Sequence, residues 1–185
     1  IDAKVDLSSY LDLLCLAIIA DIMPITGLNH TMVKQGLKKI KSSKREAFKL
    51  LNQNIQKEVL ASDDVGFTIA PKLNSAGRMD DASIALEFLI AKNQNSAFES
   101  LALLDELNNY RKALQEDISK KAEIQISFED NAIVVWGDDW HEGVIGIVAS
   151  KLSNKFKKPA FIFSIKDGIA KGSARANSEI SLYDL

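Results

Sequence analysis

Two arginines lie among small residues, in segments that could approach a phosphate group closely. Arg78 ends the run Asn74-Ser75-Ala76-Gly77-Arg78, and Arg175 lies within Gly172-Ser173-Ala174-Arg175-Ala176-Asn177. The planar fork of a guanidinium matches phosphate oxygens, small neighbours leave it room, and glycine allows a tight turn. Alternatively, Arg78 pairs with the aspartates that follow it, and Arg175 is an exposed arginine on an edge strand. The residues alone leave both pairs of readings open.

An aspartate at the end of an apolar run is a third candidate. Apolar residues at helical spacing from Leu11 to Ile22 predict a buried helix that ends near Asp21. The C-terminus of a helix carries partial negative charge, so a carboxylate there is unfavourable without a nearby cation. A metal ion or a lysine could supply that cation, and one carboxylate alone makes no metal site.

The segment Trp140-His141-Glu142-Gly143-Val144-Ile145-Gly146 leads into a predicted helix whose first N–H groups could face an anion. Its spacing is not that of a phosphate loop or a dinucleotide fingerprint. His141 is a further candidate, as a hydrogen-bond donor or an acid, although a single histidine beside a tryptophan is more often structural. His30 is assigned to a helix start.

Helices and loops dominate the predicted first part of the chain. Beyond the apolar helix we expect a second helix, capped by Asn29, and a third from Lys44 to about Leu60. A short and partly extended segment should follow at 65–71, and then a loop at 72–78. We expect two more helices, one from Asp80 or Asp81 to Ala91 and a long one from about Ser96 to Ile126.

The pattern changes after Phe128 and becomes β-α-β. We expect strands at 132–136 and 159–165 around a helix at 144–156, then an Asp167-Gly168 turn into a strand at 169–175. The predicted fold class is therefore α/β, with a mostly helical segment and a long connecting helix followed by part of a small α/β domain. The expected divisions are 1–95, 96–126 and 127–185.

Composition narrows the class of protein. The chain has 185 residues, 46% hydrophobic and 26% charged, which is the balance of a globular domain and excludes disorder and collagen-like repeats. The single cysteine, Cys15, excludes a disulfide framework and a cysteine-based zinc site, and fits a reducing, cytoplasmic location. The apolar run of about twelve residues is shorter than the roughly 20 of a membrane span, and we expect no signal peptide.

Charge is distributed unevenly although the formal net charge is only −2. That net charge argues against a surface coated by nucleic acid. Two basic tracts could flank an anionic ligand or be solvated helix faces, and the second reading is favoured on general grounds. They comprise Lys34, Lys38, Lys39, Lys41, Lys44, Arg45 and Lys49, and Lys151, Lys155, Lys157, Lys158, Lys166 and Lys171.

Four ordered segments together resemble the RecJ-type single-stranded-DNA-specific exonucleases of the DHH phosphoesterase superfamily. They are Leu11 to Pro24, Val33 to Leu37, Gly66 to Arg78, and Trp140 to Leu152. The resemblance runs almost from end to end of the chain, and two of the segments are more than ten residues long, which makes it more specific than any single pattern above.

This resemblance implies a 5′ to 3′ exonuclease that acts on single-stranded DNA in repair and recombination, with two Mn²⁺ or Mg²⁺ ions. By the same resemblance Asp21 is a metal ligand and so a catalytic residue. Arg78, in its loop with Asn74 and Gly77, is similar to a DNA-phosphate contact, and Arg175 with Ser173 holds a similar place. The expected partners are single-stranded DNA and repair proteins, with no membrane, and we expect a monomer.

The chain departs from the family pattern at two points. The family's Gly-Ser-Gly-Arg-Ser is replaced by Gly172-Ser173-Ala174-Arg175-Ala176, which removes a glycine and a hydroxyl but keeps the arginine. The family's other metal-binding motifs should lie upstream of Ile1 and its Gly-Gly-His segment downstream of Leu185, so we expect the chain to be catalytically inactive by itself.

Two alternative functions remain open. One is a relative in the superfamily that acts on short oligonucleotides or cyclic dinucleotides, against which the long helical insert between Pro24 and Gln125 argues by resemblance. The other is a non-catalytic scaffold that binds DNA or a protein partner.

Overall fold

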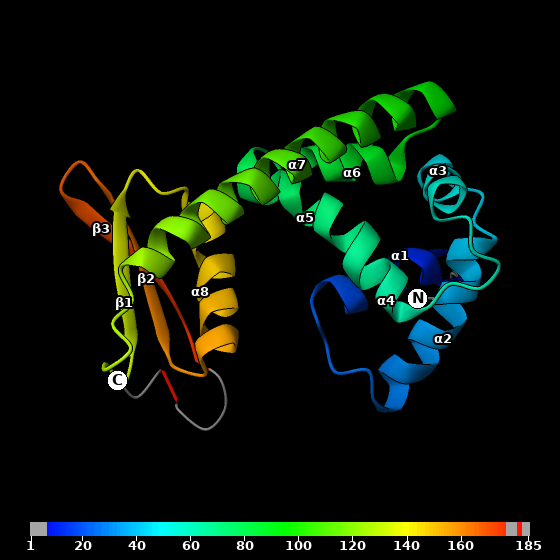
Figure 1. Ribbon diagram of the computed structural model, residues 1–185. Helices are drawn as coiled ribbons and strands as arrows, with labels where there is room; N and C mark the ends of the chain where they lie inside the picture. The colour runs from blue at the N-terminus through cyan, green and yellow to red at the C-terminus, as the bar shows by residue number, and fades with distance from the viewer. Residues whose placement is uncertain (1–6, 177–180, 183–185) are drawn as a thin grey trace, which may run out of the picture. The chain divides into compact units, whose positions relative to one another are not determined.

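The computed structural model describes residues 7–176 and 181–182. The chain divides into two compact units, Ile1–Asn108 and Asn109–Leu185, and each is described by itself. The long helix α7 (Gln94–Ile124) contributes its first half to the first unit and its second half to the second (Figure 1). The predicted fold class, mostly helical and followed by a small α/β part, is confirmed. The three-part division of the chain stays a prediction.

The first unit consists of helices. Besides the first half of α7 they are η1, a 3₁₀ turn (Leu7–Tyr10), α1 (Leu11–Ala20), α2 (Gly27–Lys41), α3 (Glu46–Ile55), α4 (Ser62–Asp64), η2, a π-helix (Val65–Ile69), α5 (Ala70–Met79) and α6 (Ser83–Ile90).

The core of this unit forms around a close crossing of α1 and α2. Gly36 makes the crossing possible, because a Cβ at that position would lie 2.3 Å from the Cβ of Cys15 and 2.6 Å from the carbonyl oxygen of Leu11. Phe48 of α3 and Phe88 of α6 are fully buried in the same hydrophobic cluster. Burial of side chains of this size removes enough apolar surface from water to hold the helices together.

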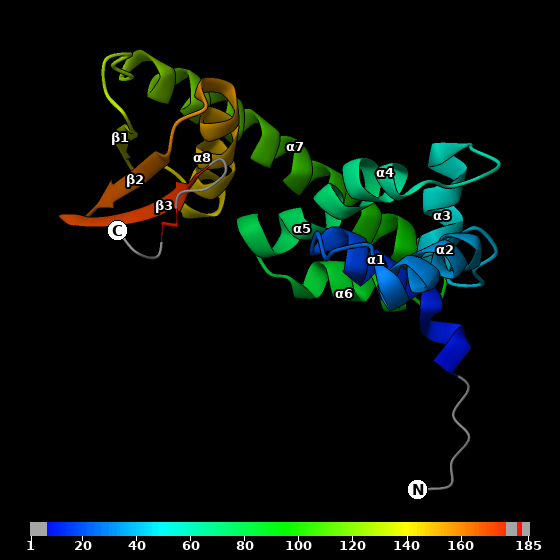
Figure 2. The ribbon, with the colours of Figure 1, turned by 90° about the horizontal axis from the view of Figure 1, so that it is seen from below.

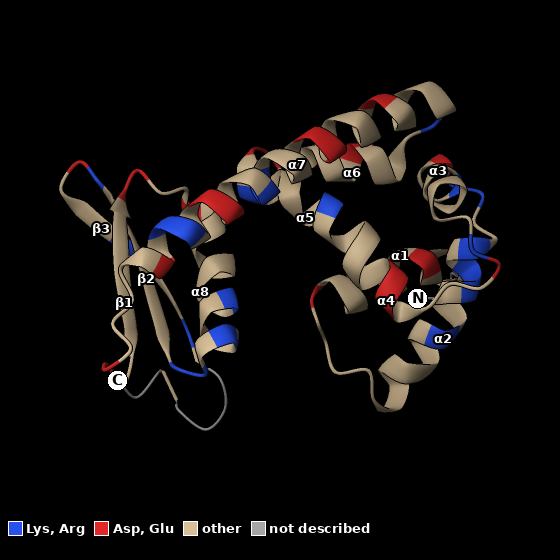
Figure 3. Ribbon diagram, viewed as in Figure 1, with Lys and Arg blue, Asp and Glu red and all other residues tan. Residues whose placement is uncertain are grey.

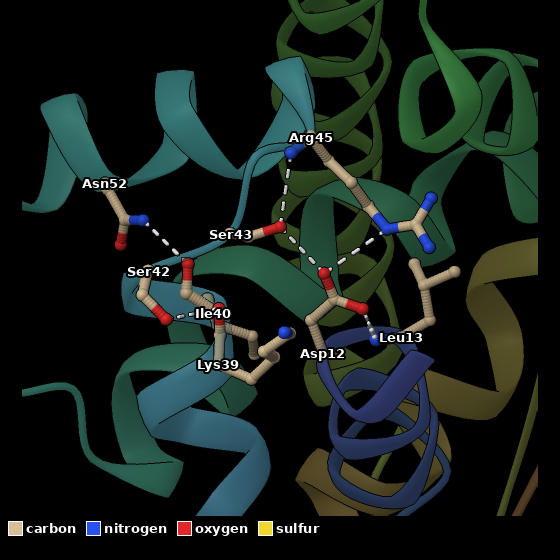
Figure 4. A network of polar contacts seen from close by, with 8 residues as sticks. All are labelled: Asp12, Leu13, Lys39, Ile40, Ser42, Ser43, Arg45 and Asn52. Carbon is tan, nitrogen blue, oxygen red and sulfur yellow. Dashed lines mark hydrogen bonds and ion pairs between the residues drawn. The ribbon is translucent and has the colours of Figure 1, made fainter. Parts of the chain in front are cut away.

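A buried carboxylate fixes the start of α1 to the connection between α2 and α3 (Figure 4). Asp12 is 1% exposed and accepts hydrogen bonds from Ser43 Oγ (2.7 Å), Arg45 Nε (3.2 Å) and the backbone N–H of Leu13 (2.8 Å). The Arg45 guanidinium also lies 5.6 Å from the centre of the Tyr10 ring. A buried charge needs such partners, so this network anchors the helix that ends at Asp21.

The predicted apolar helix is confirmed, with Asp21 as the C-terminal cap of α1. The predicted cap of the next helix is wrong, since α2 begins at Gly27 and Asn29 donates from Nδ2 to the carbonyl of Pro24 (3.0 Å). The third helix ends at Ile55 rather than near Leu60, because Gln56 adopts a left-handed conformation (φ 52°) and closes the helix there.

The predicted loop at 72–78 is wrong: these residues belong to helix α5. Pro71 is accommodated in the first turn, where its missing N–H is not needed. Ser75 and Ala76 are buried, and Ser75 Oγ lies 2.6 Å from the Lys72 carbonyl oxygen and 3.4 Å from that of Leu104 on α7. Gly77 adopts no positive φ, so helical packing outweighs the turn tendency of the small residues.

Besides the second half of α7, the second unit consists of a three-stranded sheet with one helix on it (Figures 1 and 2). The strands β1 (Ile133–Asp138), β2 (Ala160–Lys166) and β3 (Ile169–Arg175) lie in the order β1-β2-β3. β1 and β2 are parallel and are joined through α8 (Glu142–Phe156), whereas β2 and β3 are antiparallel. The predicted β-α-β pattern and the Asp167-Gly168 turn are confirmed, with φ of 51° and 76° at the two turn residues.

Helix α8 packs on one face of this sheet. Val148 and Leu152 of α8 are fully buried, as are Val135 of β1 and Ile162 of β2. Gln125, just after α7, bonds the edge strand with its side chain: its Nε2 donates to the Trp136 carbonyl (2.7 Å) and its Oε1 accepts from the Trp136 N–H (3.1 Å). In the part of the chain that the structure describes, no helix is both long and apolar enough to cross a membrane.

Candidate nucleic-acid interface

Two segments that the sequence singled out separately meet in the second unit. They are the first turns of α8 and the end of β3. A Cβ built on Gly146 of α8 would lie 3.0 Å from Ser173 Oγ and 3.5 Å from Nη2 of Arg175. The glycine therefore allows a hydroxyl and a guanidinium to lie directly against the helix, where both can reach a single phosphate group.

The end of β3 presents Arg175 in a defined orientation. Arg175 Nη1 lies 3.2 Å from Ser173 Oγ and donates to the carbonyl of Ala174 (2.7 Å), while the side chain stays exposed. Alternate residues of a strand point to opposite faces, and Ala174 pairs with Phe161 in β2. The methyl group of Ala174 therefore lies on the face away from α8.

His141 is the N-terminal cap of α8. Its Nδ1 accepts a hydrogen bond from the N–H of Gly143 (3.1 Å), and its carbonyl oxygen accepts from Val144 (2.9 Å) and Ile145 (3.2 Å). His141 therefore has a structural role as a helix cap, and its role as a donor or an acid stays a prediction. The N–H groups of Gly143 and Val144 thus already have acceptors within the chain, and that the first N–H groups of α8 could face an anion stays a prediction.

A carboxylate and an ammonium group lie beside this site. Glu142, in the first turn of α8, pairs with Lys171 of β3 at 3.0 Å. A negative charge in the first turn satisfies the helix dipole, so an incoming phosphate would depend on Ser173 and Arg175 rather than on free backbone donors of the helix.

Arg78, the other arginine that we predicted to bind phosphate, lies on an exposed surface of α5 in the first unit. Asn74, Gly77 and Arg78 are exposed, and their spacing of three and four residues places them on one side of the helix. The opposite side is held to α7, in part by an ion pair between Lys72 and Asp105 (2.5 Å). The structure thus brings these three predicted residues together, on a helix instead of a loop.

Asp21 is exposed at the end of α1, and its N–H donates to the carbonyl of Ala17 (3.0 Å). Within residues 7–176 and 181–182 no group of three or more histidine, cysteine, aspartate or glutamate side chains could hold a metal ion. The described residues therefore do not make a metal centre by themselves, and Asp21 could serve only as one ligand among others.

The first basic tract follows α2 and the start of α3 (Figure 3). Arg45 pairs with Asp12, Lys49 pairs with Glu46 (2.7 Å), and Lys41 donates to the carbonyl of Lys57. In the other four members the ammonium group has no hydrogen-bond or ion-pair partner among the described residues: Lys34, Lys38, Lys39 and Lys44. Whether this tract flanks an anionic ligand or is a solvated helix face stays a prediction.

Sequence reasoning missed Gly146 as the residue that lets α8 and β3 approach, and it missed the Asp12 network. The sequence contained a signal for the contact of Gly146, because the segment around Gly146 and the segment around Gly172 belong to one predicted β-α-β-β unit. The network had no local signal, since Asp12 and Arg45 are far apart in the sequence.

Comparisons with known proteins agree with this geometry. A family model described as the DHHA1 domain matches residues 129–185, which contain α8, the sheet, Ser173 and Arg175. The single-stranded-DNA-specific exonuclease RecJ of Salmonella typhimurium is 33% identical over 193 residues, which cover 98% of this chain and 33% of that protein. The chain thus spans about one third of the length of the curated relatives it matches.

Solved structures of RecJ proteins are also similar to this chain. A crystal structure of RecJ in complex with Mg²⁺ from Thermus thermophilus matches with a TM-score of 0.87 and 32% identity, over 96% of this chain and 28% of that one. A crystal structure of exonuclease RecJ bound to manganese matches with a TM-score of 0.83 and 32% identity, over 96% of this chain and 45% of that one. Over almost its whole length the chain is therefore similar, in sequence and in fold, to one part of the RecJ exonucleases.

Proposed function

We propose that this chain is the part of a RecJ-type exonuclease that guides single-stranded DNA and contributes to a two-metal site. The parent activity is 5′ to 3′ hydrolysis of phosphodiester bonds. The observation that carries the proposal is the convergence of Gly146, Ser173 and Arg175 within the DHHA1 match. A guanidinium and a hydroxyl at one place, with no side chain on the adjoining helix residue, suit a phosphate of the strand.

Each candidate residue has a distinct role in this proposal. Arg175 and Ser173 bind one phosphate in the second unit, and Arg78 with Asn74 binds another on the exposed side of α5. Gly77 precedes Arg78 and leaves room for Ala82, whose Cβ would lie 3.3 Å from a Cβ on the glycine. Asp21 is one metal ligand, and it depends on further ligands that the described residues do not supply. Two Mn²⁺ or Mg²⁺ ions, when bound, polarise the phosphodiester and stabilise the charge that develops during hydrolysis.

The relatives' names support the exonuclease over the two alternatives, an oligonucleotide or cyclic-dinucleotide phosphodiesterase and a non-catalytic scaffold. We extend the proposal to a setting in DNA repair and recombination in the cytoplasm, with repair proteins as partners and a monomeric chain. The buried free thiol of Cys15 is compatible with a reducing compartment.

The test is binding of the chain to labelled single-stranded and duplex oligonucleotides, measured by fluorescence anisotropy across a salt series. We expect preference for the single strand, with log affinity falling by roughly 0.7 per contacted phosphate for each unit of log salt. Arg175→Ala and Arg78→Ala should each reduce this slope by about 0.7. Lys121→Ala removes an exposed charge that pairs with Asp117 (2.7 Å) and serves as the control.

Equal slopes for all four proteins would overturn the assigned phosphate contacts.

A second measurement addresses catalysis: the chain alone should not degrade the oligonucleotide in Mn²⁺, because Asp21 has no metal-binding cluster around it among the described residues. Mn²⁺-dependent degradation that is lost in Asp21→Asn would show instead that the chain holds a complete metal site.

A further inference from the structure

A groove with both apolar and basic walls lies between helix α2 and the segment 56–60, which follows α3 in the first unit. Its volume is about 380 Å³. None of the residues that we assign to DNA or metal binding lines it, so the proposed function leaves it unexplained. Residues of α2 and of the segment line the groove: Lys34, Leu37, Lys38, Lys41, Glu58, Val59 and Leu60.

Hydrogen bonds hold the two walls of this groove together. Lys41 Nζ donates to the carbonyl of Lys57, and Asn52 Nδ2 of α3 donates to the carbonyl of Ile40 near the end of α2 (2.9 Å). Lys57 in turn pairs with Asp64 of α4 (2.5 Å). A groove that is fixed on both sides needs little rearrangement when it accepts a ligand, so less of the binding free energy is lost in ordering the chain.

The apolar residues of the groove can accept an apolar side chain. Leu60 belongs to the hydrophobic core of the first unit, and Leu37 is half-buried against the same core. Val59 is 78% exposed, so most of its side chain lies in water. A ligand that covers Val59 removes this apolar surface from water, which is favourable by about 25 cal/mol per Å². The groove therefore favours a ligand with an aliphatic or aromatic group.

The charges of the groove favour carboxylates on that ligand. Lys34, Lys38 and Lys41 lie on one side of α2, because they are spaced by four and three residues, and Figure 3 shows the basic residues along this helix. The ammonium groups of Lys34 and Lys38 have no hydrogen-bond or ion-pair partner in the part of the chain that the structure describes. Glu58 is the one acidic residue of the lining, so the three ammonium groups outweigh it.

We propose that this groove docks an acidic peptide segment of a partner protein. An apolar side chain of the peptide lies against Leu37, Val59 and Leu60, and carboxylates on either side of it pair with Lys34 and Lys38. Charge complementarity and the exposed apolar surface together favour a peptide over a nucleic-acid backbone, whose phosphates would pair with the lysines and leave Val59 uncovered. The proposal goes beyond the proposed function and does not require that the chain bind DNA.

The probe is a fluorescein-labelled peptide in which pairs of glutamates alternate with single leucines, followed by anisotropy as the chain is added. We expect it to bind and to shift the backbone amide NMR signals of Leu37, Val59 and Leu60. Two matched peptides separate the two contributions. Replacement of the leucines by serine, or of the glutamates by glutamine, should in each case weaken binding about tenfold.

Variants of the chain test the same two features. Val59→Asp should weaken binding of the glutamate-leucine peptide by about tenfold, since it replaces an apolar contact by a charge of the same sign as the peptide. Because Val59 is exposed, the melting temperature should not change. Lys38→Ala should weaken binding about threefold. Lys44→Ala, in the same basic tract but outside the groove, should leave it unchanged.

The proposal is refuted if the peptide shifts none of the amides of Leu37, Val59 and Leu60, or if Val59→Asp binds it as well as Lys44→Ala does. Displacement of the peptide by oligothymidylate, together with equal binding of the serine peptide, would also overturn it, by making the groove a nucleic-acid contact. So would a dimer of the chain that Val59→Asp dissociates in sedimentation, because a second copy would then occupy the groove. Failure of the proposed function looks different, since Arg175→Ala then has no effect on oligothymidylate while peptide binding persists.

Discussion

Gly146 on α8 faces Ser173 on β3 so closely that a Cβ on the glycine would lie 3.0 Å from the serine Oγ. This contact is tighter than ordinary van der Waals packing, and the same Cβ would lie 3.5 Å from Nη2 of Arg175. The position of the candidate phosphate-binding pair in the second unit therefore depends on a missing side chain in a neighbouring helix.

Gly146→Ala should displace Ser173 and Arg175 and lower affinity for single-stranded DNA about tenfold, the effect of one charge-assisted contact. Stability should change little, because alanine gains up to about 1 kcal/mol of helix propensity over glycine and the new contact offsets that gain. Anisotropy and thermal melting measure the two effects. Asn154→Ala, at an exposed position of α8, is the control, and equal affinities for the two variants would contradict the prediction.

Gly36→Ala should destabilise the first unit by about 2 kcal/mol, since overpacking of a close contact typically costs 1–3 kcal/mol. The new methyl would lie 2.6 Å from the Leu11 carbonyl oxygen, which belongs to the backbone and cannot rotate away. Urea unfolding measures the loss. Gly66→Ala is the matched control, because its Cβ would make an ordinary contact of 3.5 Å with Ile19, and it should be neutral or slightly stabilising.

Arg45→Ala should destabilise the chain by about 3 kcal/mol at neutral pH, because it leaves the buried Asp12 carboxylate without its ion-pair partner. The double variant Asp12→Asn, Arg45→Ala should recover part of that loss, since it buries no charge. Lys44→Ala removes a neighbouring charge with no ion-pair partner in the described residues and should change stability by less than about 0.5 kcal/mol. A double variant no more stable than Arg45→Ala would show that the charge of Asp12 is not what matters.

Stability should decrease at alkaline pH through Cys15. Burial raises the pKa of this thiol from its usual 9.0 to about 11, and the thiol donates to the Val33 carbonyl at 3.6 Å. As pH rises above 9, the unfolded thiol ionises first, so the unfolded state gains stability at up to about 1.4 kcal/mol per pH unit until the folded thiol also ionises near 11.

Comparison with Cys15→Ala in urea titrations from pH 8 to pH 11 isolates this effect from other groups that titrate there. The free energy of unfolding of the unsubstituted chain should decline more steeply than that of the variant between pH 9 and pH 11, and the difference in slope should fade towards pH 8. Parallel profiles over the whole range would refute the assignment to the thiol.

Local patterns were sufficient for the elements with strong periodicity or turn chemistry. The apolar helix that ends at Asp21, the β-α-β unit and the Asp167-Gly168 turn all follow from the spacing of apolar residues and from residues that accept positive φ. The sequence also indicated Arg78, Arg175 and Asp21 as candidates, since their residue types and neighbours carry that information locally.

Tertiary structure decided what local patterns left open. Asn74 to Arg78 contains residues that favour a turn, yet burial of Ser75 and Ala76 against α7 makes the segment helical. The pairing of Asp12 with Arg45 and the meeting of Gly146 with Ser173 each join residues from different elements. Such contacts depend on how helices and strands pack in three dimensions, so no window of neighbouring residues contains the information that specifies them.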